Sequence, residues 1–159
     1  MKLLISPFYN EEYLLPYWLK HHREIFDHGI LIDYHSTDKS VAICKELVPD
    51  WEIVTSKNHS FGAIMCDFEV MQHEKRYPNA WKLVSNTTEF LVGKHLNGVL
   101  NWLKTNDYIA GIIPAAVMVD VDPNEYLSPD IPLVKQKHFG FWKITFLMKG
   151  SNYGGNQGL

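Results

Sequence analysis

Residues 2–40 have the sequence KLLISPFYNEEYLLPYWLKHHREIFDHGILIDYHSTDKS, in which two short apolar runs flank a helical pattern. The first run, Lys2–Ser6, is closed by Pro7, and the second is Gly29–Asp33. Apolar runs of this length that end at turn residues are typical of buried strands. The segment therefore predicts a strand, a helix and a second strand.

The helix between these strands is expected to begin near Pro16, because proline is tolerated in a first helical turn, and to end at Gly29. We interpret His22 as a core histidine with a backbone partner, because it falls on the apolar face. That face consists of Leu15, Trp18, Leu19, His22 and Phe26.

The strand-then-helix step is repeated further along the chain. Ser36-Thr37-Asp38 supplies capping side chains for a second helix, which carries Val41, Cys44 and Val48. Parallel strands need a crossover between them, so this alternation predicts an α/β fold of three layers around a mostly parallel sheet. The next elements expected are a strand at Trp51–Thr55, a helix with Phe61, Met65, Phe68 and Gln72 on one face that stops before Pro78, and a strand at Ala80–Ser85.

The pattern loosens after a helix at His95–Lys104 and a strand at Tyr108–Ile113. Phe139–Leu147 is expected to form a strand or a hairpin arm. We expect residues 1–148 to form one α/β domain and the glycine-rich residues 149–159 to be a flexible tail. The missing closing element suggests a fragment or a shortened member of a larger family.

Composition excludes several classes of protein. The chain has 159 residues and a formal net charge of −3, and its basic residues are scattered, which excludes a phosphate-backbone-binding stripe and argues against nucleic acid as a partner. Cys44 and Cys66 lack CxxC spacing, which favours a reducing compartment. No apolar run is long enough to span a membrane, so we expect a cytoplasmic protein, with peripheral membrane association also compatible.

Polar side chains follow three of the predicted strands. Ligands of open α/β sheets bind at the carboxyl ends of the strands, so these residues are expected to converge on one edge. Asp33 is suited to accept a hydrogen bond from a base or a ribose, and Ser36 is suited to face a phosphate. Pro7 and Phe8 are suited to flank a base. Asp, Ser and Asn are also common in turns and caps, and that reading has a comparable weight. The three groups are Asn10, Glu11 and Glu12; Asp33, Ser36 and Asp38; and Asn86, Thr87, Thr88 and Glu89.

Two of these groups carry a resemblance to a known family. The segment Phe8–Glu12, followed by Leu15, Trp18 and His22 and then by Ile32–Ser40, resembles the opening of family-two-like glycosyltransferases of the GT-A fold. The family pattern is N-E, an amphipathic helix with W and H, and D-N-G-S-T-D-G-S. The resemblance covers roughly Leu3 to Val92.

The resemblance implies a nucleotide-diphosphate sugar as donor, with uridine as the expected nucleoside. It also implies an acceptor that is a saccharide or a lipid-linked glycan, and inversion at the anomeric carbon. By position, the nucleotide-binding residues are Pro7, Phe8, Asn10, Glu11, Asp33, Ser36, Asp38, Asn86 and Thr88.

The chain departs from the family at the D-x-D-E-F motif, which corresponds to Asn86-Thr87-Thr88-Glu89-Phe90. Both aspartates are neutral residues here, so only Glu89 keeps a carboxylate for Mn²⁺ or Mg²⁺. Three alternatives stay open. The enzyme is metal-independent, with a histidine or a lysine (Lys57, Lys82 or Lys94) compensating charge; it binds metal weakly through Glu89 and water; or it is inactive.

Glu89 is also the catalytic candidate, as the carboxylate that takes the proton from an acceptor hydroxyl. Asp120, Asp122 and Asp130 are weaker candidates, because each lies beside proline or in a polar loop. An aromatic platform for the acceptor sugar is a further alternative to simple core packing. Its members would be Phe139, Phe141, Trp142 and Phe146.

Other enzyme classes lack their motifs. No G-x-G-x-x-G turn follows the first strand and no G-x-x-x-x-G-K-[ST] loop occurs, which argues against dinucleotide oxidoreductases and P-loop NTPases. The serious alternative is a non-catalytic sugar-nucleotide or carbohydrate-binding module on the same scaffold.

Overall fold

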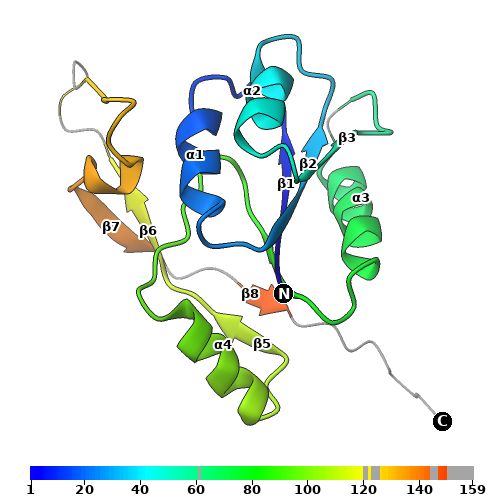
Figure 1. Ribbon diagram of the computed structural model, residues 1–159, viewed down its shortest axis with the longest axis vertical. Helices are drawn as coiled ribbons and strands as arrows, with labels where there is room; N and C mark the ends of the chain where they lie inside the picture. Colours follow the sequence, from blue (N-terminus) through cyan, green and yellow to red (C-terminus); the bar gives the residue numbers. More distant parts are fainter. Residues whose placement is uncertain (61, 120–121, 123–125, 144–146, 150–159) are drawn as a thin grey trace.

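The structure is a computed structural model that describes residues 1–60, 62–119, 122, 126–143 and 147–149 (Figure 1). The elements are β1 (Lys2–Phe8), α1 (Leu15–His22), β2 (His28–Asp33), α2 (Ser40–Leu47), β3 (Glu52–Thr55), α3 (Ala63–Lys75), β4 (Trp81–Val84), α4 (Leu96–Thr105), β5 (Ala110–Ile112), β6 (Ala115–Met118), the 3-10 helix η1 (Leu133–Lys135), β7 (Gly140–Lys143) and β8 (Leu147–Lys149).

Four strands form the central sheet in the order β3-β2-β1-β4, and every neighbouring pair is parallel. Helices α1 and α2 cover one face of this sheet and α3 covers the other (Figure 1). The predicted α/β fold with three layers and a parallel sheet is confirmed.

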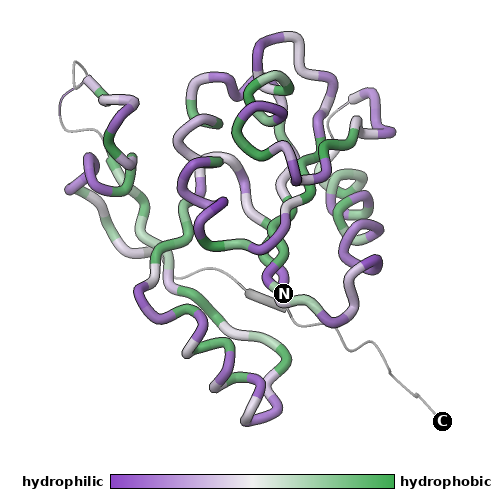
Figure 2. Tube along the Cα trace, in the orientation of Figure 1, coloured by the Kyte–Doolittle hydropathy of each residue, from purple (hydrophilic) through white to green (hydrophobic). Residues whose placement is uncertain are grey.

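The two faces of the sheet use alternate residues of the same strands. Leu4 and Leu31 belong to the apolar cluster under α1 and α2, whereas Ile5 and Ile30 belong to the cluster under α3. All four side chains are fully buried. Strands covered on both faces need a nearly continuous apolar sequence, and Figure 2 shows β1 and β2 as mostly hydrophobic.

Two predicted boundaries are wrong. β1 continues through Pro7 to Phe8 rather than ending at Pro7. Its pairing with β4 ends at Ile5, so Pro7 lies where only β2 is a neighbour, and proline is tolerated on such an edge. Helix α1 ends at His22 and not at Gly29, because the carbonyl of His22 accepts from both Ile25 and Phe26 in a closing turn.

The predicted face of α3 is also wrong. The residues of this helix that are buried are Cys66 and Val70. Met65 and Phe68, which the apolar spacing placed on the packed face, are each 53% exposed. Phe61 lies outside the described residues.

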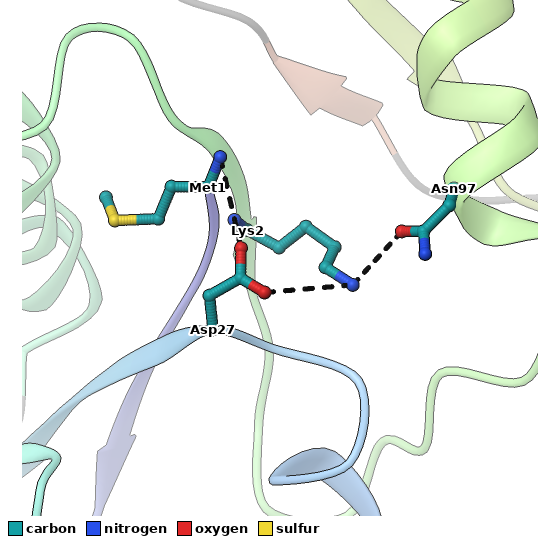
Figure 3. Close-up of polar contacts among 4 residues, drawn as sticks. All are labelled: Met1, Lys2, Asp27 and Asn97. Atoms are coloured by element: carbon teal, nitrogen blue, oxygen red, sulfur yellow. Dashed lines mark hydrogen bonds and ion pairs between the residues drawn. The ribbon is translucent and has the colours of Figure 1, made fainter.

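A polar cluster at the amino end of β1 joins three parts of the chain (Figure 3). The backbone N–H of Lys2 donates to Asp27 at 2.7 Å, and Lys2 Nζ donates to Asn97 Oδ1 at 3.1 Å. Lys2 Nζ also lies 3.9 Å from Asp27 Oδ1. Helix α4 is thereby tied to the end of the sheet opposite the carboxyl ends of the strands.

The last part of the described chain forms two antiparallel ribbons outside the central sheet. β5 pairs with β8, and β6 pairs with β7. The expected helix at 95–104 and strand at 108–113 correspond to α4 and β5. The segment 139–147 contributes β7 and the start of β8, with residues 144–146 outside the described residues, as is 150–159 of the expected tail. None of the helices in the described parts is both long and apolar enough to cross a membrane.

Candidate nucleotide-sugar site

A cavity of about 840 Å³ opens at the carboxyl ends of the parallel strands. The strands that follow β1 in the chain, β2 and then β3, lie on one side of it, whereas β4 pairs with β1 on its other side. The strand order therefore reverses between β1 and β4. Such a switch point is where open α/β sheets bind their ligands, and 300–1,000 Å³ is the usual size of a small-molecule site. The cavity draws its lining from the ends of β1, β2 and β4, from the loop after β3 and from α3.

Six of the residues expected at the site line this cavity: five of the expected nucleotide-binding residues, and Glu89, the expected catalytic and metal-binding residue. The first three follow or end β1, and the others lie in the loop after β4. The remaining expected residues, Asn10, Asp33, Ser36 and Asp38, are absent from the described lining. The six are Pro7, Phe8, Glu11, Asn86, Thr88 and Glu89.

Asn10 and Ser36 hold the loops after β1 and β2 together. The backbone N–H of Asn10 donates to Ser36 Oγ at 3.0 Å, and Asn10 Oδ1 accepts from the Thr37 N–H at 2.8 Å. Asn10 adopts a left-handed backbone with φ 51°, a conformation that asparagine tolerates well. These contacts fix the rim of the cavity.

Asp38 also links the loops after β1 and β2. Its carboxylate accepts from the Glu12 N–H at 3.0 Å and from the Ser40 N–H at 2.9 Å at the start of α2. Burial raises the pKa of Asp38, but the hydrogen bonds from Ser40 and Glu12 outweigh it and leave the pKa below its ordinary value. Asp33, at the end of β2, is buried and accepts from the Ser36 N–H at 2.8 Å.

The loop after β4 is held by a hydrogen bond within the loop and by hydrogen bonds with helix α1. Glu89 Oε2 accepts from the Asn86 N–H at 2.8 Å, and the Glu89 carbonyl accepts from Trp18 Nε1 at 2.8 Å. His22 Nδ1 donates to the Trp18 carbonyl at 3.0 Å, while its Nε2 accepts from the Leu91 N–H at 3.2 Å. The core role expected of His22 is therefore confirmed, and it supports the candidate site indirectly.

The side chains of this loop do not fit a divalent-metal site. Mg²⁺ and Mn²⁺ need carboxylate oxygens, and the residues at the two aspartate positions are Asn86 and Thr88. One carboxylate oxygen of Glu89 is engaged with the backbone of its own turn. Within the described residues, no group of three or more His, Cys, Asp or Glu side chains is placed to hold a metal ion.

The loop after β3 contributes residues that the sequence analysis did not single out. Asn58, His59 and Ser60 line the cavity, as do Tyr34 and His35 after β2. The His35 and His59 rings are stacked, with centroids 5.2 Å apart and planes 19° from parallel. The same rule that selected residues after the other strands would have found them, had it been applied to the end of β3.

Glu69 on α3 organises that loop. Its carboxylate accepts from Ser56 Oγ at 2.6 Å, the Lys57 N–H at 2.9 Å, Asn58 Nδ2 at 3.0 Å and Tyr34 Oη at 3.0 Å. Burial raises the pKa of Glu69, but these four hydrogen bonds outweigh it, and the pKa lies below the ordinary value. The charged carboxylate thus joins the loops after β2 and β3.

The other candidates are not among the described lining residues of the cavity. None of Lys57, Lys82 and Lys94 is among its described lining residues, and Lys82 is buried within β4. Asp122 and Asp130 do not line it either, and Asp120 lies outside the described residues. Phe139, Phe141 and Trp142 are exposed at the β6–β7 ribbon, whereas Phe146 lies outside the described residues.

Comparison with known proteins identifies structural neighbours. No family model matches the sequence, and no curated protein matches it. A crystal structure of S. aureus TarS superposes with a TM-score of 0.53 at 15% identity, over 82% of this chain and 23% of that one. A second structure, of S. aureus TarS 1-349, gives a TM-score of 0.57 at 16% identity, over 80% and 39%.

This chain therefore spans well under half the length of the neighbours it matches. At this identity the likeness concerns the fold. TarS is a GT-A-like family-two glycosyltransferase, and the α/β architecture with its four-stranded parallel sheet is the GT-A-like fold of that enzyme.

Proposed function

We propose that the protein is a glycosyltransferase that binds a nucleoside-diphosphate sugar, expected to be uridine-linked, in the cavity at the carboxyl ends of β1 and β4. The observation that carries the proposal is the position of this cavity. It lies at the switch point of a GT-A-like sheet, and Glu11 of the N-E motif and residues of the loop after β4 line it.

In this proposal, Pro7 and Phe8 flank the nucleotide and Glu11 lies beside them. Asp33 interacts with the base. Asn10, Ser36 and Asp38 set the positions of the loops that enclose the nucleotide. Asn86 and Thr88 face the donor from the loop after β4. The roles of the loop residues are consistent with their mutual hydrogen bonds.

The reaction is transfer of the sugar to a saccharide or lipid-linked glycan. The acceptor hydroxyl oxygen attacks the anomeric carbon, the bond from that carbon to the diphosphate breaks, and Glu89 takes the hydroxyl proton, with inversion of configuration. We propose no metal-dependent step, because the donor set around Glu89 lacks the carboxylates that such an ion requires.

A binding module without catalysis is the second candidate. The observation that favours it is the engagement of Glu89 with the Asn86 N–H, since a carboxylate used to close a turn is less free to act as a base. Hydrolysis of donor separates the two functions, because many transferases slowly pass the sugar to water and a binding module does not.

Calorimetry with UDP and GDP, with and without Mn²⁺, tests the site. Ala63 is exposed and lines the cavity, so Ala63→Trp is expected to weaken UDP binding at least about tenfold by filling the space. Ala42→Trp on the exposed side of α2 is the matched control and should bind as the parent does. Asp33→Asn keeps an acceptor for the Ser36 N–H but removes the carboxylate, and it is expected to weaken UDP binding. Absence of UDP and GDP binding under both conditions would refute the nucleotide site.

A further inference from the structure

The charges that line the cavity are unusual for a site that takes an anionic donor. Three carboxylates line it, on Glu11, Asp67 and Glu89. No lysine or arginine occurs among its described lining residues, and the side chains there that can become positive are His35 and His59. A diphosphate entering this space meets net negative charge unless the histidines are protonated or another cation accompanies it.

The two histidines form a preassembled pair. His35 follows β2 and His59 follows β3, and their rings stack with a centroid separation of 5.2 Å. Both side chains are exposed at the cavity. Two imidazolium rings at this distance repel each other, so a bound anion is what would allow both to be charged.

The backbone at His35 is held in a demanding conformation. Its φ is 61°, in the left-handed region, where the resembled family has glycine in D-N-G-S. A side chain in this region costs free energy relative to glycine, although histidine is among the residues that tolerate it better. The His35 ring carried by this backbone stacks on the His59 ring.

Glu69 fixes both histidine-bearing loops at once. It accepts from Tyr34, the neighbour of His35, and from Asn58, the neighbour of His59. The pair is therefore positioned by Glu69, whose charged carboxylate is hydrogen-bonded to both loops.

We propose that His35 and His59 bind the diphosphate of the donor as imidazolium groups, so that nucleotide binding takes up protons and needs no metal ion. This inference rests on the proposed function. Histidine is the side chain that ordinarily changes charge between pH 5 and 8, and uptake of a proton on binding makes affinity rise as pH falls.

The described residues that line the cavity with the pair include three acidic groups, Glu11 after β1, Asp67 on α3 and Glu89 after β4. Lys57, two residues before His59, is basic. Tyr9, Tyr34 and Cys66 also line the cavity, and burial raises the pKa of Tyr34 above its ordinary value, so its phenol stays neutral. The bound diphosphate adds negative charge beside the two rings, and that added charge favours their protonation on binding.

The test is calorimetry in EDTA at pH 6 and pH 8, with UDP and with inorganic pyrophosphate as probes, in two buffers of different ionisation enthalpy. The parent protein is expected to bind both probes about tenfold or more tightly at pH 6 than at pH 8, with net proton uptake of about one or more. His35→Asn combined with His59→Gln should abolish the uptake and flatten the pH dependence. Asparagine is chosen because it tolerates the left-handed backbone.

His138→Gln is the matched control, because His138 is an exposed histidine that does not line the cavity. It should keep the parent's pH dependence. Urea unfolding of each variant establishes that the exposed substitutions leave the fold intact.

The outcomes separate this inference from the proposed function. UDP binding that is equally tight at both pH values, or that stays pH-dependent in the double variant, overturns the role of the histidines and leaves the nucleotide site standing. Proton-linked binding of pyrophosphate with no gain from the nucleoside supports the histidine pair and contradicts the nucleotide proposal. Failure of both probes to bind at either pH overturns both.

Discussion

His22 connects the first helix to the segment that follows β4. Its side chain is fully buried, with Nδ1 bonded to the Trp18 carbonyl and Nε2 to the Leu91 N–H. This arrangement requires the neutral ring with its proton on Nδ1. Burial and the nearby His21 lower the pKa of His22 to about 3, against the opposing effect of the Trp18 hydrogen bond.

A pH dependence of stability follows from that shift. Between pH 6.5 and about 3, the unfolded chain binds a proton at His22 that the folded chain does not, so stability is lost on acidification. The loss from this residue is about 2 kcal/mol between pH 6.5 and pH 5. His22→Gln should be less stable at pH 7, with a smaller further loss on going to pH 5.

Urea unfolding at pH 5, 6 and 7 measures this effect, with His138→Gln as the control that should keep the parent's slope. Equal slopes for the parent and His22→Gln would contradict a buried neutral histidine.

At the scale of single residues, the sequence predicted which side chains meet at the cavity better than it predicted their hydrogen bonds. Glu11 and Glu89 line the cavity as expected, because residues after parallel strands necessarily meet at one edge. The hydrogen bond between Asn10 and Ser36 could not be predicted. It depends on how two loops separated by more than twenty residues come together, which no local pattern encodes.

At the scale of elements, α3 shows where apolar spacing misleads. Its apolar residues fall on more than one side of the helix, and only contact with the sheet decides which side is buried. Cys66 and Val70 face the sheet, whereas Phe68 faces solvent.

Paired substitutions on α3 test this assignment. Val70→Ala is expected to lower the free energy of unfolding by about 1–3 kcal/mol, because it empties part of the core under the helix. Phe68→Ala removes a larger side chain but should change stability by no more than about 0.5 kcal/mol, because that side chain is 53% exposed. Urea unfolding of both variants compares the two, and a greater loss for Phe68→Ala would show that the helix packs through the other face.

The Trp51 indole, just before β3, packs against Gly29 of β2. A Cβ atom at Gly29 would lie 2.1 Å from Trp51 Cε3, a distance that no side chain can accept without movement. Gly29→Ala is therefore expected to destabilise the protein by about 1–3 kcal/mol.

The same substitution at Gly98 is the matched control. Gly98 lies in α4 with nothing within 4 Å of an added Cβ, so Gly98→Ala should stabilise by up to about 1 kcal/mol. Denaturant midpoints at constant m measure both changes. A neutral result at Gly29 would mean that the indole does not occupy the position described.

The strands and helices as far as β4 were largely predictable, because each short apolar run is followed by a capping or turn signal. β6 was not predicted, and the pairings of β5 with β8 and β6 with β7 were not either. These ribbons consist of three or four residues per strand and join segments 22 or more residues apart, so their pairing leaves little trace in local sequence.

At the scale of the whole molecule, the cavity and α4 lie at opposite ends of the parallel sheet. The carboxyl ends of the strands carry the cavity, and the Lys2–Asp27–Asn97 cluster anchors α4 at the amino end (Figures 1 and 3). A ligand bound at one end is therefore expected to leave the other end unchanged. The location of ligand-induced changes in the protein therefore tests the central claim.

Titration of the isotope-labelled protein with UDP, followed through backbone amide resonances, tests that claim most directly. The account predicts that shifts concentrate at residues 34–36, 58–60 and 85–89, which lie at or beside the cavity, while residues 96–112 of α4 and β5 stay in place. Shifts that are absent at saturating UDP, or that gather on α4 and the ribbons instead, would contradict a nucleotide site at the carboxyl end of the sheet.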